Sequence, residues 1–260
     1  MSIAIITGAS SGIGAEFAKG YASRVDELWL VARREDKLTE LGEELGVKYR
    51  VISADLSTSG GINALRKQLE SEKPKVKYLV NAAGFGDFGA FDEISEQRVE
   101  GMIDLNVKSV VLITHMTIPY MECGGRIIMM GSGSCFAPLP YFNVYSSGKV
   151  FVLHYTKSLN FEIKKYGLRA TCFCPGWVYT EFLGKATSGS NITRPKESAM
   201  KPMLSCERVV KGAIRASDKG RVMYVTNWYT KLQHLLFKLV PDKILTKIWL
   251  GMLESPEEIK

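Results

Sequence analysis

A turn near the start of the chain reads Thr7-Gly8-Ala9-Ser10-Ser11-Gly12-Ile13-Gly14. It follows an apolar run at residues 3–7 and precedes a helical pattern at residues 14–23. The three glycines permit a tight turn and let the backbone approach a pyrophosphate, which then lies at the positive end of the helix. An ordinary strand-to-helix connection is the alternative. Because the turn lies between a strand and a helix of one βαβ unit, it predicts a dinucleotide site.

The rest of the chain alternates short apolar runs with longer helical patterns. The expected strands are residues 3–7, 28–32, 48–53, 78–81, 125–131, 168–174 and 222–225. The expected helices are residues 14–23, 35–45, 62–71, 96–121, 144–166 and 206–216. Buried strands separated by helices are typical of a parallel sheet with right-handed crossovers and helices on both faces. We therefore expect an α/β fold, a single-domain Rossmann-type doubly wound parallel sheet of about seven strands.

The bulk composition is typical of a soluble globular protein. Of the 260 residues 46% are hydrophobic and 23% charged, which excludes disordered and fibrous classes. The first residues lack the pattern of a targeting signal, and five cysteines at irregular spacing do not make a disulfide framework. Cys172 and Cys174 alternate within a strand pattern, so we interpret them as strand residues rather than metal ligands. A cytoplasmic protein without a metal site is expected.

The positive charge is concentrated toward the C-terminus. The net charge is +7, and residues 211–250 hold eight Lys or Arg against two Asp. A local basic tail does not indicate nucleic-acid binding. Within residues 228–252 an apolar stripe recurs at helical spacing, and Pro241 divides it into two helices. This amphipathic tail has three interpretations: it covers a substrate site, packs against a second subunit, or lies on an anionic surface such as a membrane or an acyl-carrier protein.

The end of the second expected strand carries the signal for the choice of cofactor. It reads Leu30-Val31-Ala32-Arg33-Arg34, with Ala32 where an NAD site places an acid for the ribose 2′-hydroxyl. The guanidinium groups of Arg33 and Arg34 are suited to a 2′-phosphate, although they could also be solvated charges at a strand end. The pattern therefore predicts that the cofactor is NADP(H) rather than NAD(H).

Further motifs occur in a fixed order along the chain. They are Ala54-Asp55-Leu56, Asn81-Ala82-Ala83-Gly84, Leu105-Asn106-Val107, Met130-Gly131-Ser132, Tyr145-Ser146-Ser147-Gly148-Lys149 and Cys174-Pro175-Gly176-Trp177-Val178-Tyr179-Thr180. Together with the glycine turn, they make residues 2–225 resemble the short-chain dehydrogenase/reductase family. The resemblance implies a hydride transfer between a nicotinamide and a carbonyl or alcohol.

Tyr145 and Lys149 stand one helical turn apart, on one face of an expected helix. A tyrosine has a reference pKa of ~10, and a nearby ammonium favours the phenolate. We therefore expect Lys149 to lower the pKa of Tyr145, which would act as the general acid or base. The resemblance implies that Ser132 orients the substrate and that Asn106 supports a proton-relay water and positions the lysine. Ser134 is a rival for the role of Ser132, because Gly131 stands where the family often has a second serine.

The resemblance also implies a set of cofactor contacts and a substrate pocket. The expected cofactor-binding residues are Gly8, Ser10, Ser11, Gly12, Ile13, Gly14, Arg33, Arg34, Asp55, Leu56, Asn81, Ala82, Ala83, Gly84, Tyr145, Lys149, Pro175, Gly176, Val178 and Thr180. The expected pocket residues are Ser134, Phe136, Tyr141, Phe142, Trp177, Phe182 and Leu183, which suggest an apolar substrate.

The sequence thus predicts an NADP(H)-dependent oxidoreductase acting on an apolar ketone or a 3-oxoacyl compound. We expect residues 1–226 to form the dinucleotide-binding and catalytic domain and residues 227–260 a helical extension of it. A homodimer or homotetramer is expected. Two rival functions are a redox-sensing protein that holds NADP(H) without turnover and a sugar-nucleotide epimerase or dehydratase.

Overall fold

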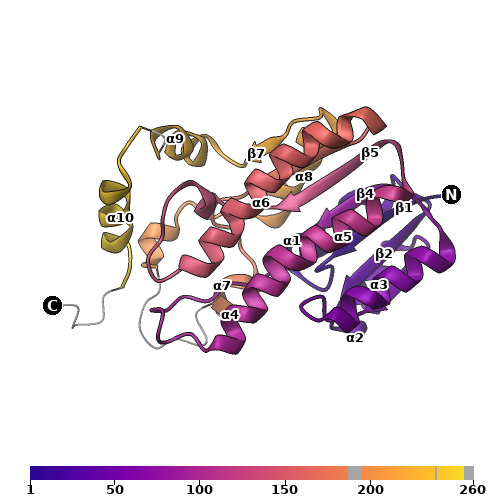
Figure 1. The fold of residues 1–260 in the computed structure, drawn as a ribbon, viewed down its shortest axis with the longest axis horizontal. Helices are drawn as coiled ribbons and strands as arrows, with labels where there is room; N and C mark the ends of the chain where they lie inside the picture. Colours follow the sequence, from indigo (N-terminus) through magenta and orange to yellow (C-terminus); the bar gives the residue numbers. More distant parts are fainter. Residues whose placement is uncertain (187–194, 238, 255–260) are drawn as a thin grey trace.

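Seven parallel strands form one sheet in the order β3-β2-β1-β4-β5-β6-β7 (Figure 1). The computed structural model describes residues 1–186, 195–237 and 239–254. The strands are β1 Ser2–Thr7, β2 Glu27–Ala32, β3 Tyr49–Ser53, β4 Lys75–Asn81, β5 Met121–Met130, β6 Arg169–Cys174 and β7 Met223–Val225. All seven predicted strands are therefore present, and the predicted Rossmann-type fold is confirmed. Strands β4 and β5 begin earlier than their apolar runs suggested.

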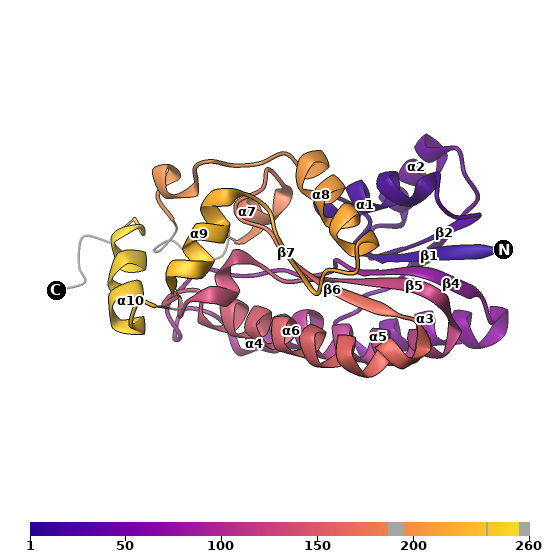
Figure 2. The same ribbon diagram turned by 90° about the horizontal axis from the view of Figure 1, so that it is seen from above.

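Helices cover both faces of the sheet (Figure 2). One layer contains α1 Gly12–Ala22, α2 Glu35–Leu45 and α8 Cys206–Asp218. The opposite layer contains α3 Ser59–Glu72, α4 Glu96–Ile103, α5 Ser109–Thr117 and α6 Asn143–Glu162. This two-sided cover explains why the strands read as continuous apolar runs rather than as alternating ones. Strand β2, for instance, has all six residues buried.

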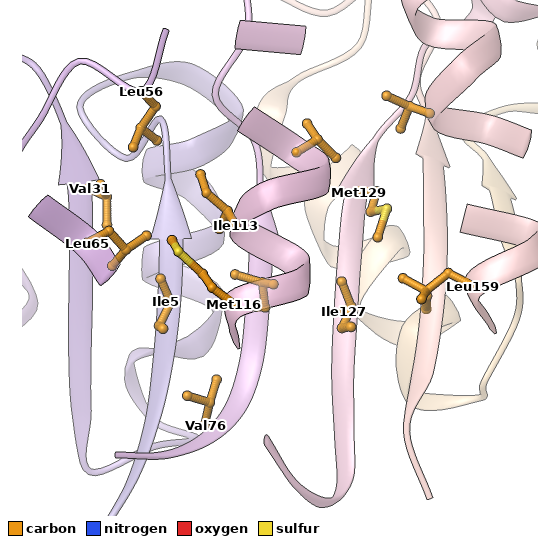
Figure 3. Close-up of a cluster of buried hydrophobic side chains, with 14 of the residues drawn as sticks. Ile5, Val31, Leu56, Leu65, Val76, Ile113, Met116, Ile127, Met129 and Leu159 are labelled. Atoms are coloured by element: carbon orange, nitrogen blue, oxygen red, sulfur yellow. The ribbon is translucent and has the colours of Figure 1, made fainter. Parts of the chain in front are cut away.

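A continuous core lies between the sheet and the second of these layers (Figure 3). Ile5, Val31 and Ile127 project from β1, β2 and β5, and Leu65 of α3 and Ile113 of α5 belong to the same cluster. All five are at most 1% exposed. Each such side chain contributes roughly 1.5–3 kcal/mol through removal of apolar surface from water. The core holds the strand ends, and therefore the loops that follow them, in fixed positions.

The stretch predicted as one helix over residues 96–121 is interrupted. Helix α4 passes into a π-helical turn, η1 Asp104–Lys108, before α5 begins. The helical path then ends in the 3₁₀ turn Ile118–Tyr120, because Pro119 cannot continue it. Met121 already pairs with Val76 as the start of β5. The prediction was wrong at both points.

Two segments follow the last long strand. The region 181–203 contains the short helix α7 Glu181–Ala186 and the 3₁₀ turn Glu197–Met200, while residues 187–194 lie outside the described part. The tail forms α9 Trp228–Phe237 and α10 Asp242–Gly251, with Pro241 as the N-cap of α10, so the predicted division is confirmed. Both helices lie at the end of the molecule opposite the N-terminus (Figures 1 and 2). Among the described residues, no helix has the length and apolar character needed to cross a bilayer.

Candidate active site

A cavity of about 420 Å³ lies at the carboxyl ends of the strands. The chain leaves β1 toward one side of the sheet and β4 toward the other, so these neighbouring strands mark the switch point of the topology. Ligands bind at this position in open α/β sheets. Residues from the glycine turn, from the ends of β4, β5 and β6 and from α6 line the cavity.

The glycine turn is shaped for the close approach of a phosphate. Gly8 has φ +69°, and a Cβ there would lie 2.8 Å from the backbone N of Ala83. A Cβ on Gly14 would overlap the carbonyl oxygen of Gly8. Ser11 takes the N-cap position in an extended conformation, and the N-terminus of α1 borders the cavity. This cradle fits a pyrophosphate, because backbone N–H groups and the helix dipole both favour an anion there. The neighbouring Ser10, Gly12 and Ile13 line the same wall.

The two arginines after β2 border the cavity and have different surroundings. Arg34 donates from Nη2 to the carbonyl oxygen and to Oγ of Ser10, both at 3.2 Å. Its Nη1 lies 3.4 Å from a carboxylate oxygen of Glu181 in α7. The side chain of Arg33 is 75% exposed, and its Nη1 lies 3.9 Å from Asp55 Oδ2. Two guanidinium groups therefore border the cavity next to Ala32.

Most of the other expected cofactor residues line the cavity as well. They are Asp55, Leu56, Ala82, Ala83, Gly84, Pro175, Gly176, Val178 and Thr180. Asn81 differs, because it is buried below the cavity and donates from Nδ2 to Thr114 Oγ1 at 2.9 Å. Thr7 accepts from the backbone N–H groups of Ala82 and Ala83 at 3.1 Å. The glycine turn and the end of β4 are thus joined at Thr7.

The phenol of Tyr145 lies among aromatic rings at the inner end of the cavity. Its ring centroid is 4.4 Å from that of Phe142 and 5.4 Å from that of Phe182. Gly86 makes room for it, since a Cβ at that position would lie 2.6 Å from Tyr145 Cδ2. Burial raises the pKa of Tyr145, and a hydrogen bond with Ser132 opposes that effect. The lowered pKa expected from the sequence is therefore not what the structure gives.

Lys149 is buried one helical turn below Tyr145. Its Nζ donates to the carbonyl oxygen of Met130 at 2.8 Å and lies 5.3 Å from the centroid of the Tyr145 ring. Burial lowers the pKa of Lys149 to about 8, against an ordinary 10.5. The predicted pair therefore shares one site, but each member is shifted mainly by burial and away from its charged form.

Ser132 and Ser134 follow β5 and line the cavity near Tyr145. Ser132 forms a hydrogen bond with Tyr145 and accepts one from the backbone N–H of Ser134 at 3.1 Å. The hydroxyl of Ser134 is buried and finds no partner within the described residues. A Cβ on Gly131 would lie 2.7 Å from Cys172 Sγ, so a serine there would clash with the buried thiols of β6. Of the two serines, Ser132 is therefore the one that forms a hydrogen bond with Tyr145.

Asn106 lies in the π-helical turn η1. Such turns often occur at functional sites, because they redirect one side chain within a helix. Its Nδ2 donates to the carbonyl oxygen of Phe85 at 2.7 Å, while its Oδ1 is buried and has no partner in the described structure. A Cβ on Gly84 would lie 2.5 Å from this Oδ1 and 3.5 Å from Lys149 Nζ. The amide oxygen and the ammonium thus border the same small space.

The outer wall of the cavity is apolar. Of the expected substrate residues, Ser134, Phe142, Trp177, Phe182 and Leu183 line it. Phe136 and Tyr141 do not. Phe136 turns toward α9, where its ring centroid is 4.0 Å from that of His234. Tyr141 takes a left-handed conformation with φ 63°. It packs from outside against an aromatic cluster, whose buried members include Phe88, Phe142, Tyr145 and Trp249.

The tail supplies residues that the sequence analysis did not assign to the pocket. Phe237 of α9 and Leu245, Ile248 and Trp249 of α10 line the cavity. Trp249 also donates from Nε1 to the carbonyl oxygen of Pro140 at 2.8 Å, which ties α10 to the loop before Tyr145. In the sequence, only the apolar stripe of the tail indicated these contacts. Of its three interpretations, the one in which the tail covers a substrate site agrees with them.

Comparison with known proteins agrees with this geometry. A family model described as short chain dehydrogenase matches residues 2–191. The sulfoacetaldehyde reductase 2 of Chromohalobacter salexigens is 35% identical over 197 residues, which cover 72% of this chain and 77% of that protein. A short-chain dehydrogenase from Sphingobium yanoikuyae in complex with NADPH has a TM-score of 0.79 at 23% identity, over the full length of both chains. The bulky-bulky ketone specific alcohol dehydrogenase from Comamonas testosteroni has a TM-score of 0.72 at 25% identity, over 92% of this chain and 93% of that one.

Proposed function

The chain belongs to the short-chain dehydrogenase family, and we propose that it is an NADP(H)-dependent reductase of apolar ketones or 3-oxoacyl compounds, reversible toward the alcohol. Members of the family are oxidoreductases that use a nicotinamide cofactor. One observation carries the proposal: Ser132, Tyr145 and Lys149 meet in the cavity that also holds the glycine turn. A site with these two parts can place a carbonyl carbon beside a dinucleotide and a carbonyl oxygen beside a phenol.

The proposed roles follow from the protonation states of the residues. Bound NADPH would supply the hydride. Because burial raises the pKa of Tyr145, the phenol keeps its proton at neutral pH and can deliver it to the oxygen of a reduced carbonyl. Ser132, already bonded to Tyr145, is placed to donate to the same oxygen and to orient it. Lys149 holds positive charge below this site. The Oδ1 of Asn106, which has no partner among the described residues, is suited to accept a hydrogen bond from a water that passes a new proton toward Tyr145.

The preference for NADP(H) is proposed from charge alone. Ala32 offers no carboxylate for a ribose 2′-hydroxyl, while Arg33 and Arg34 border the same part of the cavity. Charge-assisted bonds from guanidinium to phosphate are worth ~1.5–3 kcal/mol. Arg34 is already oriented by Ser10, so it loses little freedom when it takes a phosphate.

An apolar substrate is supported by the walls of the cavity. Phe142, Trp177 and Phe182 line one side, and Leu245 and Trp249 of the tail line another. Apolar walls with a few convergent polar groups are typical of sites that bind small organic molecules. The alcohol dehydrogenase of Comamonas testosteroni, which shares the fold, is described as specific for bulky ketones.

We further propose that the chain forms a homodimer or homotetramer in a reducing compartment such as the cytoplasm. The layer of α4 and α6 presents Ile103, Val150 and Phe151, each more than a third exposed, and these apolar side chains are suited to contact a second copy. All five cysteines are free thiols, which supports the reducing location. The division into a catalytic region 1–226 and a helical extension 227–260 stays a prediction.

The function is tested by following NADPH absorbance with a panel of ketones and 3-oxoacyl thioesters of increasing apolar size. We expect turnover with several bulky members of the panel. The variant Tyr145→Phe should lose activity by about 10²–10⁴-fold, because the proton donor is gone, while it still binds NADPH by fluorescence titration. Binding of NADPH without turnover of any panel member by the wild-type chain would favour a sensor over an enzyme.

A further inference from the structure

The outer surface of α9 is apolar. Leu232 and Leu235 are 43% and 57% exposed, and Leu239, just beyond the helix, is 77% exposed. The inner side is occupied differently, with Thr230 buried and Phe237 lining the cavity. The helix therefore uses one side to close the cavity and presents leucines to the solvent on another. Exposed leucines on consecutive turns are unusual for a surface that meets only water.

Helix α10 repeats this arrangement in a regular way. Residues four apart share a face of a helix, and α10 contains three such pairs side by side. Leu245 and Trp249 are buried, and Trp249 belongs to the cluster that contains Phe142 and Tyr145. Ile244 and Ile248 form the next face and are 50% and 48% exposed. The third face carries Lys243 and Lys247, which are both exposed. The helix thus passes from buried apolar to exposed apolar to basic around its circumference.

We propose that this tail surface, made of Leu232, Leu235, Leu239, Ile244 and Ile248 with Lys231, Lys243 and Lys247, docks the protein on an anionic lipid bilayer. Helices that lie in the plane of a membrane carry an apolar face for the acyl region and lysines for the head groups. Residues 227–254 contain four lysines against Asp242 and Glu254 only. The net positive charge complements the negative surface of a membrane that contains acidic lipids.

A bilayer explains the surface better than a second copy of the chain. Subunits in a symmetric dimer present the same patch to each other, so one interface would enclose the lysines of both copies. The layer of α4 and α6 already offers exposed apolar side chains for that contact, with Ile103, Val150 and Phe151. An acidic carrier protein could match the charge, but it would leave the row of exposed leucines and isoleucines without an apolar partner.

The position of the surface also connects it to the cavity. Ile248 is exposed on the tail surface and lines the cavity, and Met252 at the end of α10 lines it too. On the proposed function, docking would set the mouth of the substrate pocket against the acyl region, where an apolar ketone partitions. This second step rests on that function, whereas docking itself does not.

The experiment is co-sedimentation of the full chain with vesicles, without cofactor or substrate. One set of vesicles contains phosphatidylcholine with phosphatidylglycerol, and the other contains phosphatidylcholine alone. We expect the protein to pellet with the anionic vesicles, to be released by salt, and to stay in solution with the neutral ones. The variant Lys243→Gln/Lys247→Gln should lower the partition coefficient roughly 25-fold, at about fivefold for each lysine. The variant Leu235→Ser/Leu239→Ser should lower it by about tenfold or more.

Control variants remove exposed lysines or exposed apolar surface from another part of the molecule. Lys164→Gln/Lys165→Gln and Phe161→Ser alter exposed residues at the end of α6, and both should bind vesicles like the wild type. NADPH binding and circular dichroism check that the tail variants are folded. The proposal is overturned if the wild type fails to pellet with anionic vesicles, or if the control variants lose binding as much as the tail variants do. It is also overturned if analytical ultracentrifugation shows the tail variants breaking up a larger assembly, because a second copy would then cover the surface.

Discussion

Lys149 Nζ lies 5.3 Å from the centroid of the Tyr145 ring, and its hydrogen bond goes to the carbonyl oxygen of Met130 rather than to the phenol. The lysine is only 2% exposed, and burial lowers its pKa to about 8. Its charge is therefore held at a cost to stability. The two residues act on the same site without being bonded to each other.

The first prediction concerns the stability of a variant without this buried charge. We expect Lys149→Met to raise the free energy of unfolding at pH 7 by about 3 kcal/mol, because a pKa lowered from 10.5 to about 8 corresponds to that penalty. Between about pH 8 and 10.5 the unfolded chain holds a proton that the folded wild type has lost. The stability of the wild type therefore gains with pH across this window, and its difference from the variant shrinks. Urea unfolding at pH 7 and pH 10 measures both values, and a difference that does not change with pH would contradict the assignment.

The second prediction concerns the pH dependence of reduction. The raised pKa of Tyr145 keeps the phenol protonated through the neutral range, whereas Lys149 loses its charge near pH 8. We expect kcat/KM for ketone reduction to be flat below about pH 8 and to fall about tenfold per pH unit above it. Lys149→Arg keeps its charge at all these pH values and should lose the falling limb, even at reduced activity. If the limb persists in this variant, another group is responsible for it.

The third prediction uses the close approach of Gly86 to Tyr145. A Cβ at position 86 would lie 2.6 Å from the tyrosine ring and 3.1 Å from the ring of Phe142. Gly86→Ala should therefore displace the phenol and lower kcat by about 10²-fold, because a shift of about 1 Å has that effect on positioned groups. NADPH binding should be retained. Gly60→Ala, where the nearest atom is Thr58 Oγ1 at 3.8 Å, is the matched control and should leave kcat unchanged.

The fourth prediction concerns the choice between cofactors. Arg33 is mostly exposed, so Arg33→Ala should leave the stability of the fold nearly unchanged. If its guanidinium holds a 2′-phosphate, the Michaelis constant for NADPH should rise by about 10–100-fold while that for NADH stays constant. Steady-state kinetics with both cofactors and one ketone measure the two constants. Equal changes in both would show that Arg33 does not read the phosphate.

Local patterns predicted the scaffold of this site, and tertiary contacts decided its details. The apolar runs identified every strand, because burial on both faces of a sheet leaves a continuous signal. The spacing of Tyr145 and Lys149 placed both on one face of α6. The π-helical turn at Asn106 leaves no such trace, since the helical pattern continues through it. The bond from Lys149 to Met130 joins α6 to β5, and no spacing within one helix could predict it.

The pocket wall shows the same limit. Phe136 and Tyr141 were expected there, yet the 3₁₀ turn and the loop between β5 and α6 direct these side chains elsewhere, and composition does not reveal such directions. Helix α10 instead closes the cavity, although it lies about a hundred residues further along the chain. Its apolar stripe indicated that one face would be covered, but it carried no information about which surface would cover it.

The last prediction tests whether this helix shapes the substrate site. Trp249 lines the cavity, lies in the aromatic cluster with Phe142 and Tyr145, and donates to the carbonyl oxygen of Pro140. Trp249→Ala removes a large apolar surface from the wall, so the KM for bulky ketones should rise about tenfold or more. The KM for a small ketone and the affinity for NADPH should change little, because neither needs this wall. Trp249→Phe keeps most of the apolar contact and loses the hydrogen bond, so we expect an increase of only a few-fold, the value of one neutral hydrogen bond. If the KM rises equally for small and bulky ketones, α10 supports the fold of the site without contacting the substrate.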